Sequence, residues 1–383
     1  MVRQSELAFR TLARRHNFPL AFTPMIPAVA YSMFTEEERQ NNFDLGDDES
    51  LLVAQLCGHD PSTMIVAAKA LLATGRVDAI DINLGCPQQC AKRGGYGAFL
   101  LERDQWPTVD RLIRSMVDAG VSPLWCKIRL LENHMMTMEF LLMLKKAGIS
   151  LVTIHGRKRE QRSCERADWA SIRRVVDDLK CLERLERLDD AGVGDRRRLF
   201  VLSNGSVSSV EAAIECERMT ECDGIMVAEG LLENPWKFDV VVVEGALVVG
   251  EGGGGEDETG GVASVCHARE YLECARKFPP PKLSRGRCLR DHVGWMLKKN
   301  LLLLVEEEEK EEEREDREER EEKSGRGGSS RALLGMLEND KMVTMWQMEH
   351  FLNHVEEYYL HGSVERSGLI VLSLKDILKG EKD

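Results

Sequence analysis

The chain has 383 residues, of which 43% are hydrophobic and 31% charged, as is typical of a globular protein with one large domain and a smaller one. Its eleven cysteines are odd in number and form no CxxC pair. This usage argues against a disulfide framework and predicts a reducing compartment, the cytoplasm or the nucleus. The longest apolar runs, such as 301–305 and 368–374, are much shorter than the roughly 20 residues that cross a bilayer, so we expect no membrane partner.

The net charge of −13 would by itself disfavour a nucleic-acid partner. Residues 306–322, however, contain thirteen acidic and four basic side chains, so most of the negative charge lies in one short segment. The remainder of the chain is close to neutral and can still present a basic face. The charge balance therefore does not exclude RNA.

A predicted helix at Ser5–His16 is followed by short apolar runs that alternate with helical patterns as far as residue 232. Several of these runs are rich in Val and Ile, as buried parallel strands are. The seven runs are Leu20–Ile26, Leu51–Leu56, Ala79–Leu84, Leu124–Ile128, Leu151–Ile154, Leu199–Leu202 and Gly224–Val227. This alternation predicts an α/β fold with a parallel sheet, most simply a TIM (β/α)8-type barrel. Because no strand precedes the first helix, we expect the barrel to lack its first strand.

Two helix starts are marked by capping residues. Asp60 followed by Pro61 predicts a cap and a first-turn proline for a helix that ends near Gly75. Ser208 with Glu211 three residues later is the pattern of a capping box, and predicts a helix over 212–219.

The character of the sequence changes after residue 240, which we expect to end the barrel domain 1–240. Residues 241–263 are rich in glycine and acidic residues and are predicted to form a linker. Residues 264–360 are predicted to form a helical domain, interrupted by a disordered acidic insertion at 306–330, and 361–383 are read as a tail.

Polar residues follow or end six successive predicted strands. In a parallel barrel the carboxyl ends of the strands meet at one edge, and function gathers there. A whole ring of polar groups is hard to explain by packing, because a buried polar group without a partner costs free energy. The ring comprises Gln55, Asn83, Lys127 with Arg129, His155, Asn204-Gly205-Ser206 and Ala228-Glu229.

This ring suits flavin mononucleotide (FMN). Asn204-Gly205-Ser206 offers backbone N–H groups to a phosphate at the usual phosphate site of such barrels. Lys127 can stabilise the negative charge of a reduced flavin, and Gln55 can hydrogen-bond the polar edge of the ring. A lone His155 is more often a structural histidine, and Arg129 fits an ion-pair partner equally well.

Cys86 lies on a predicted tight turn between Gly85 and Pro87. A neutral thiol at that position could donate a proton to a substrate carbon. Taken alone, the cysteine would more often be a small buried side chain. Asn83 and the later ring favour the functional interpretation.

No metal site is predicted. His350 and His354 lie one helical turn apart, as zinc ligands do, but no glutamate follows His350 and no third ligand is apparent.

The stretch from Asp81 to Leu100, DINLGCPQQCAKRGGYGAFL, resembles the tRNA-dihydrouridine synthases, in particular the eukaryotic branch that acts on uridines 16 and 17 of the D-loop. Further segments match the family in the same order and extend the resemblance over roughly residues 1–238. They are Gln55–Gly58, Cys126–Arg129, Thr153–Arg157, Ser203–Gly205 and Val227–Gly230. The family's first strand ends in an Ala-Pro-Met motif that contacts the flavin, and Met1-Val2 stands where that motif would finish.

The resemblance implies an FMN-dependent reduction of uridine to 5,6-dihydrouridine in tRNA, with NADPH or NADH as reductant and Cys86 as proton donor. It assigns the flavin to Gln55, Lys127, His155, Asn204, Gly205, Ser206, Ala228 and Glu229. It places Asn83 and Arg129 at the uracil, and Lys92, Arg93 and Arg157 at the mouth of the site, where they could meet phosphates. The helical domain would grip the tRNA, and we expect a monomer.

Two other functions are compatible with the sequence. One is another FMN barrel oxidoreductase that acts on a free pyrimidine, which the helical domain and the Gly-Cys-Pro turn disfavour. The other is an inactive tRNA-binding or scaffold protein, which the missing first strand would explain.

Overall fold

The computed structural model describes residues 4–46, 51–162, 164–188, 197–238, 240–243, 246–249, 260–281, 287–297 and 352. The predicted acidic insertion at 306–330, the helix expected near 341–359 and the tail at 361–383 lie outside these residues, apart from Leu352.

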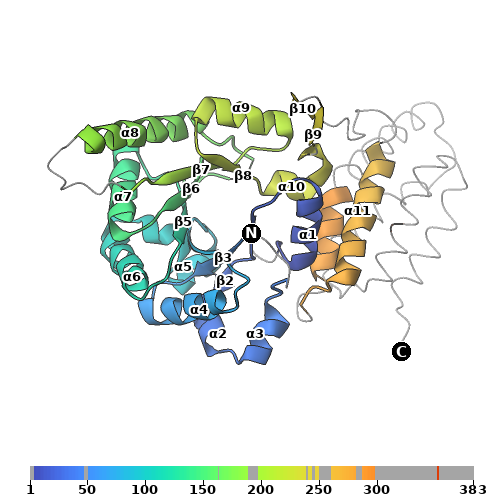
Figure 1. The fold of residues 1–383 in the computed structure, drawn as a ribbon, viewed down its shortest axis with the longest axis horizontal. Helices are drawn as coiled ribbons and strands as arrows, with labels where there is room; N and C mark the ends of the chain where they lie inside the picture. Colours follow the sequence, from blue (N-terminus) through green and yellow to red (C-terminus); the bar gives the residue numbers. More distant parts are fainter. Residues whose placement is uncertain are drawn as a thin grey trace, which may run out of the picture. The chain divides into compact units, whose positions relative to one another are not determined.

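A curled parallel sheet forms the centre of the larger part of the chain (Figure 1). Its strands follow one another in chain order, and from the third strand to the eighth each pairs with the next in parallel. The strands are β1 (Ala21–Phe22), β2 (Ile26–Pro27), β3 (Leu52–Cys57), β4 (Ala79–Leu84), β5 (Leu124–Arg129), β6 (Leu151–His155), β7 (Phe200–Asn204) and β8 (Gly224–Met226). Both β1 and β2 pair with β3, so they form one interrupted strand and the sheet has seven strand positions, as the sequence predicted. Within the described ranges β8 does not pair with β1 or β2, so the TIM-type sheet is curled but open.

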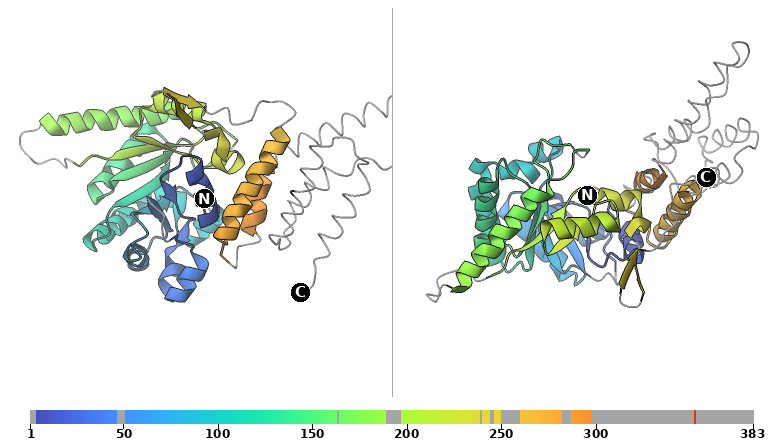
Figure 2. Two further views of the ribbon diagram at one scale, coloured as in Figure 1. Left: turned by 45° about the vertical axis from the view of Figure 1, so that its right-hand side comes forward. Right: turned by 90° about the horizontal axis from the view of Figure 1, so that it is seen from above.

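Helices cover the outer face of this sheet, as Figures 1 and 2 show. The covering helices include α4 (Pro61–Ala73), α6 (Trp106–Asp118), α7 (His134–Ala147), α8 (Trp169–Leu188) and α9 (Val210–Thr220). The other helices along this part of the chain are α2 (Ala28–Met33), α3 (Glu36–Asn42), α5 (Gln89–Gly94) and α10 (Glu229–Glu233). Short 3₁₀ helices occupy Gly97–Leu101 and Arg103–Gln105. The core consists of apolar strand residues such as Ile82 and Ile128 together with helix residues such as Leu71 and Leu112, all fully buried.

The capping predictions have different outcomes. Asp60 caps α4, since its carboxylate accepts a hydrogen bond from Thr63 N at 3.0 Å and Pro61 opens the helix, as predicted. The predicted cap Ser208 is wrong: the N-cap of α9 is Ser209, whose hydroxyl accepts from Ala212 N. The backbone of Ser208 instead lies against Gly230, where a Cβ on the glycine would come within 2.7 Å of it.

The same aspartate arrangement starts two strands of the sheet. Asp78, immediately before β4, exchanges two hydrogen bonds with Leu52: its N–H donates to Leu52 O at 2.8 Å, and its carboxylate accepts from Leu52 N at 2.7 Å. Asp223, immediately before β8, does the same with Val201, with both distances 2.8 Å. Each carboxylate therefore satisfies the N–H that begins the ladder of the preceding strand.

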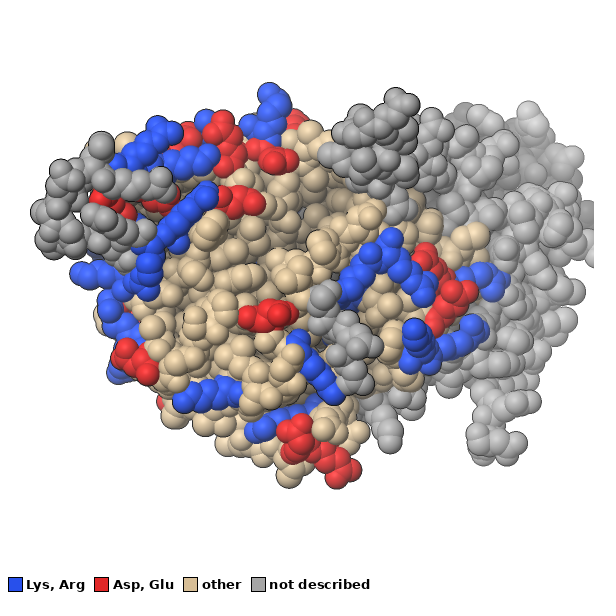
Figure 3. Space-filling view, in the orientation of Figure 1, with Lys and Arg blue, Asp and Glu red and all other residues tan. Residues whose placement is uncertain are grey.

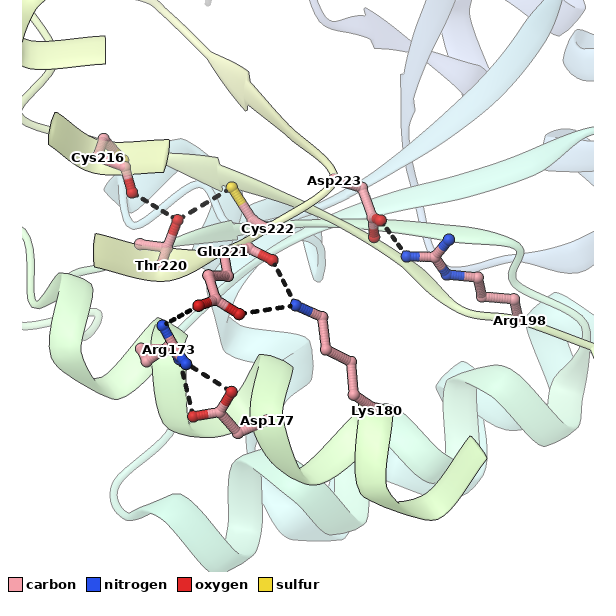
Figure 4. A network of polar contacts seen from close by, with 9 residues as sticks. All are labelled: Arg173, Asp177, Lys180, Arg198, Cys216, Thr220, Glu221, Cys222 and Asp223. Carbon is pink, nitrogen blue, oxygen red and sulfur yellow. Dashed lines mark hydrogen bonds and ion pairs between the residues drawn. The ribbon is translucent and has the colours of Figure 1, made fainter. Parts of the chain in front are cut away.

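Charged groups surround Asp223 at the amino end of β8 (Figure 4). Arg198 pairs with Asp223, while Glu221 accepts from Arg173 at 2.8 Å and from Lys180 at 3.3 Å. Arg173 and Lys180 belong to α8, so this network joins that helix to the turn between α9 and β8. It lies at the strand start, opposite the edge where the predicted functional residues gather.

The described residues divide into two compact units. Unit 1 consists of residues 1–6 and 18–230 and contains the sheet; unit 2 consists of residues 7–17 and everything from 231 onward. Unit 2 contains α1 (Leu7–Arg15), a 3₁₀ helix at Pro235–Phe238, an antiparallel pair of strands β9 (Val240–Val243) and β10 (Ala246–Val249), helix α11 (Gly260–Lys277) and a helical segment at 287–297.

Helix α1 packs against α11 within unit 2. Phe9 and Leu12 are buried there with Tyr271 and Leu272, and Phe9 stacks on His292 with ring centroids 4.4 Å apart. The sequence grouped the first helix with residues 1–240, but packing places it with the C-terminal helices. The pair β9–β10 and the first turn of α11 occupy part of the predicted linker 241–263; residues 250–259 lie outside the described residues.

Among the described residues, no helix has the length and apolar content that a membrane crossing requires.

The paired aspartates generate a stability prediction. Asp78→Ala and Asp223→Ala should each lower the free energy of unfolding by about 1 kcal/mol, because each leaves a strand-initiating N–H without its acceptor. Urea unfolding followed by circular dichroism would measure the change. Asp104→Ala is the matched control and should change the midpoint least, because Asp104 is exposed and accepts a hydrogen bond from the neighbouring Gln105 side chain. Equal shifts in all three variants would contradict the prediction.

Candidate functional site

Polar side chains gather on one face of the sheet, in three rows set by strand register. Residues paired across parallel strands share a face, as do residues two apart on one strand. The first row is Gln55, Asp81, Trp125; the second is Asn83, Lys127, Thr153; the third is Arg129, His155, Asn204. The opposite face carries apolar residues such as Ile82, Cys126 and Val152. The structure therefore brings together on one face the residues that the sequence placed at five successive strand ends.

A hydrogen-bond chain runs along the first two strands of this face. Asp81 Oδ2 accepts from Gln55 Nε2 at 2.8 Å, and Gln55 Oε1 accepts from Asn83 Nδ2 at 2.9 Å. The backbone N–H of Gln55 donates to the hydroxyl of Thr23, in the break between β1 and β2. All four residues are buried, so these bonds fix the side chains in one arrangement.

The same Asn83 carboxamide organises the turn that carries Cys86. Asn83 Oδ1 accepts from Gly85 N at 3.1 Å and from Cys86 N at 3.0 Å. On the far side of the turn, Cys86 O accepts from Ala98 N at 2.9 Å. The cysteine is thereby held at the carboxyl end of β4.

The Cys86 thiol is half-buried. Burial raises the pKa of this thiol above its ordinary value, although a backbone hydrogen bond from Gln88 opposes the shift. At neutral pH the sulfur therefore keeps its proton. A protonated thiol can serve as a general acid.

Lys127 and Asp81 are a lysine and a carboxylate on the same polar face. Burial, and secondarily the charge of Arg129, lowers the pKa of Lys127 to about 8. Burial raises the pKa of Asp81 to about 7, against the hydrogen bond from Gln55 and the charge of Lys127. Within the part of the chain that the structure describes, no hydrogen bond or ion pair occupies the Lys127 ammonium, so its charge is available to an anion.

Two buried oxygens on this face lack a partner among the described residues: Asp81 Oδ1 and Thr153 Oγ1. A buried polar atom without a hydrogen bond costs free energy. Asp81 lies in the same row as Gln55, and Thr153 lies in the same row as Lys127. A bound polar ring such as a flavin could supply the hydrogen bonds that these two oxygens lack.

His155 stays neutral because it is largely buried and because positive charges lie near it. Burial, with the charges of Lys127, Arg129 and Arg157, lowers the pKa of His155 to about 2. Arg157 Nη1 lies 3.1 Å from His155 Nε2. Since a guanidinium only donates, Nε2 is the acceptor, and the imidazole proton resides on Nδ1.

Arg157 also anchors the loop after β7, because its Nη2 donates to Ser206 Oγ at 3.1 Å. Only 6% of Arg157 is exposed, so this side chain lies inside and not at the surface. The guanidinium lies behind the β7 loop because its three donor nitrogens find acceptors there, in His155, Ser206 and the Glu165 carbonyl.

Two glycines bring the loops after β7 and β8 close together. Gly205 has a φ of 109°, and a Cβ on it would lie 2.7 Å from the His155 ring. A Cβ on Gly230 would lie 2.5 Å from Val207 O. The N–H groups of Gly205 and Ser206 donate no hydrogen bond within the described residues, which suits a phosphate. The side chain of Asn204, by contrast, is engaged by Met226 O at 2.8 Å.

Arg129 connects two loops at the edge of this face. Its Nε donates to Gly85 O, and its Nη1 to Lys158 O, both at 2.9 Å. Neither acceptor is a carboxylate, so the ion-pair interpretation of Arg129 is not what the structure shows. The side chain remains half-buried beside the Cys86 turn.

The other predicted residues lie toward solvent. Lys92 and Arg93 are exposed on α5, directly after the Cys86 turn, and Lys158 is exposed after β6. Ala228 is half-buried, and Glu229 is exposed at the start of α10. Figure 3 shows basic and acidic side chains mixed over this view of unit 1, so charge alone does not identify a partner.

A family model for dihydrouridine synthase (Dus) matches residues 1–183 and 191–248, which is more than half of the chain. The chain belongs to the dihydrouridine synthase family.

Relatives in this family include a mouse protein named as a tRNA-dihydrouridine(16/17) synthase-like protein, 37% identical over 284 residues that make up 73% of this chain and 51% of that protein. The tRNA-dihydrouridine(16/17) synthase of Saccharomyces cerevisiae is 34% identical over 63% of this chain and 53% of its own length. A tRNA-dihydrouridine(20a/20b) synthase of Schizosaccharomyces pombe is 33% identical over 62% of this chain and 66% of its own. The chain thus spans about half the length of the 16/17 relatives it matches.

Sequence reasoning missed three residues of the polar face: Thr23, Asp81 and Thr153. Asp81 and Thr153 each stand two positions before a predicted site residue, Asn83 and His155. The alternation along a strand was therefore the signal that could have found them. Thr23 lies in the break between β1 and β2, and its bond to Gln55 has no local sequence signal.

Gly205 provides a test of the close approach between the β7 loop and His155. Gly205→Ala should destabilise the protein by about 2 kcal/mol or more, because the left-handed backbone is strained and the methyl group overlaps His155. Gly120→Ala, also at a positive φ of 83° but with nothing within 4 Å of the built Cβ, is the control for backbone strain alone. Thermal unfolding would measure the stability of both variants. Equal losses of stability in Gly205→Ala and Gly120→Ala would show that the contact with His155 is not tight.

Proposed function

We propose that this chain reduces uridine to 5,6-dihydrouridine in the D-loop of tRNA, as an FMN-dependent enzyme that uses NADPH or NADH. The observation that carries the proposal is the polar face, in which Gln55, Asn83, Lys127, Arg129 and His155 lie beside a protonated Cys86 thiol in a member of the dihydrouridine synthase family.

The residues of this face fit a flavin. Gln55, Lys127 and His155 would hold the ring: Gln55 offers an amide, Lys127 a charge without a partner among the described residues, and His155 a neutral imidazole with a proton on Nδ1. The unpartnered oxygens of Asp81 and Thr153 support the same placement.

The phosphate of the cofactor would bind between the loops after β7 and β8. Gly205 and Ser206 provide N–H groups, and Ala228 with Glu229 lines the other loop. Arg157 supplies a buried positive charge directly behind Ser206. We therefore assign Arg157 to the cofactor phosphate instead of the RNA.

When bound, the flavin supplies the hydride that is added to C6 of uracil. Cys86 Sγ holds the proton that is added to C5, so that the C5–C6 double bond becomes a single bond. Asn83 fixes the backbone of the cysteine, and Arg129 holds the Gly85 carbonyl, so the thiol is oriented before the substrate arrives. We also assign Arg129 and Asn83 to the recognition of the uracil carbonyls.

The exposed side chains Lys92 and Arg93 immediately follow the Cys86 turn and would contact tRNA phosphates. Such contacts position the RNA and weaken with salt. The helices of unit 2 would provide a second tRNA contact.

Cys86→Ala tests the proton donor. The variant should retain bound flavin but lose about 100-fold or more of its dihydrouridine-forming rate, because no other acid is held at that position. The measurement is dihydrouridine content of tRNA lacking the modification, after incubation with NADPH. Cys90→Ala, at an exposed cysteine on α5, is the control and should remain active.

Full activity in Cys86→Ala would refute the assignment of the proton donor. A wild-type protein that binds tRNA but purifies without flavin and forms no dihydrouridine would favour the scaffold function instead. Activity on free uracil but not on tRNA would favour a pyrimidine oxidoreductase.

Lys127 predicts a pH dependence. Its pKa of about 8 means that the ammonium is charged below pH 8 and neutral above it. The rate of flavin reduction by NADPH should therefore fall as pH rises through about 8, and Lys127→Met should remove this inflection and slow the reaction at neutral pH. Stopped-flow absorbance measures both, with the exposed Lys69→Met as control. An unchanged profile in Lys127→Met would contradict this role.

A further inference from the structure

Two histidines and a glutamate meet in unit 2, whereas the polar face belongs to unit 1. His16 follows the last residue of α1, and His267 and Glu270 lie on α11. Their ligand atoms are all within 4.8 Å of one another. The sequence predicted no metal site, and the separation along the chain explains why: α1 and α11 meet across more than 250 positions, as the 255-residue separation of Arg15 and Glu270 illustrates.

A single carboxylate oxygen lies at the centre of this cluster. Glu270 Oε2 is 3.4 Å from His16 Nε2 and 4.0 Å from His267 Nδ1. The other oxygen, Oε1, accepts from Arg15 Nη1 at 3.2 Å. The arginine therefore orients the carboxylate so that Oε2 faces both imidazoles.

The His267 ring is held in place by stacking. The indole of Trp236 lies parallel to it, with centroids 3.7 Å apart and planes inclined by 9°. His267 and Glu270 are three residues apart on α11, which places them on one face of the helix. His16 is itself buried, with 8% of its side chain exposed, and meets the His267 ring edge-on at 6.1 Å. Two ligands are thus fixed by packing before any ion binds.

The donor set matches divalent zinc. Two histidine nitrogens and one carboxylate oxygen are a common three-ligand set for Zn²⁺, with a fourth position left for water. Tetrahedral coordination with bonds of about 2.0–2.1 Å brings the ligand atoms to about 3.4 Å from one another. The His16–Glu270 separation already has this value, and the widest pair must close by little more than an ångström. The side chains of His267 and Glu270 are 21% and 28% exposed, so an ion can reach them.

We propose that His16, His267 and Glu270 form a binding site for one divalent transition-metal ion, Zn²⁺ in the first instance, that joins the end of α1 to α11. This site is distinct from the polar face and independent of the proposed dihydrouridine synthesis. The ion would cross-link the end of α1 to α11, two segments that are distant along the chain. The ordinary alternative is a histidine–carboxylate ion pair that binds no metal.

The test uses the full chain, freed of metal with a chelator, and Zn²⁺ as the probe. Isothermal titration calorimetry should show one equivalent bound, and saturating Zn²⁺ should raise the melting temperature by ligand linkage. His16→Ala, His267→Ala and Glu270→Gln should each weaken the affinity at least tenfold and abolish the thermal shift. Glu270→Gln keeps the test usable if a histidine variant does not fold, because it preserves side-chain shape.

Two controls separate this site from other ligands. His134→Ala removes the exposed His134–Asp178 pair, whose atoms are 2.7 Å apart, in unit 1. Cys266→Ser removes the exposed thiol next to His267. Neither should change the affinity. With Co²⁺ as a spectroscopic substitute, wild type should show tetrahedral ligand-field bands without a thiolate charge-transfer band.

Three results would overturn the proposal: no saturable Zn²⁺ binding by wild type, equal affinity in wild type and in Glu270→Gln, or a thiolate band that disappears in Cys266→Ser. Because the measurement is metal affinity, none of these outcomes bears on dihydrouridine formation. Conversely, an inactive Cys86→Ala variant should bind Zn²⁺ as wild type does.

Discussion

A buried chain of hydrogen bonds from Asp81 through Gln55 to Asn83 connects the sheet to the turn that carries Cys86. Asn83 contributes both ends of its carboxamide: the nitrogen donates to Gln55, and the oxygen accepts from the two backbone N–H groups that begin the turn. The position of the thiol therefore depends on strand register. A slip of one residue in β4 would move Asn83 to the apolar face and free the turn at the same time. The apolar rows on the opposite face, packed against the helices, oppose such a slip and so stabilise the site.

The polar face carries more positive than negative side chains. Lys127, Arg129 and Arg157 act together on His155, while the buried carboxylate of Asp81 has Lys127 beside it and is itself partly neutral at pH 7. Burial, together with repulsion from these cations, depresses the pKa of His155. His155 is the neutral member of the group because an imidazole gives up its proton more readily than a guanidinium does. A face of this kind lowers the free energy of a bound anion. A cofactor with a phosphate at one end and a ring that becomes negative on reduction meets positive charge at both places.

The sequence predicted the strand positions well because buried parallel strands are continuous apolar runs, and their ends mark one edge of the sheet. For the same reason it predicted several residues of the polar face, although not Thr23, Asp81 or Thr153. It did not predict side-chain partners: Arg157 was expected at the surface because it is charged, but three acceptors that are distant in sequence or on a loop hold it inside. The Ser208 cap was displaced by one residue because contact with Gly230, a tertiary effect, holds Ser208 in the loop. The His16 cluster has no local pattern, since one of its members lies at the end of a different helix.

Contacts between residues that are distant in sequence also explain why α1 belongs to unit 2 and not to the barrel domain that the sequence predicted. Nine residues are too few for a helix that is stable in isolation, so α1 forms because it buries an apolar side. That side, with Phe9 and Leu12, finds its partners in Tyr271 and Leu272 of α11, and Arg15 and His16 at the end of α1 both contact Glu270. Unit 2 therefore needs residues 7–17 as well as the chain from residue 231 onward. Residues 7–17 are close to the first strands in sequence, but they pack against α11. A domain boundary drawn from sequence order would therefore divide the core of unit 2.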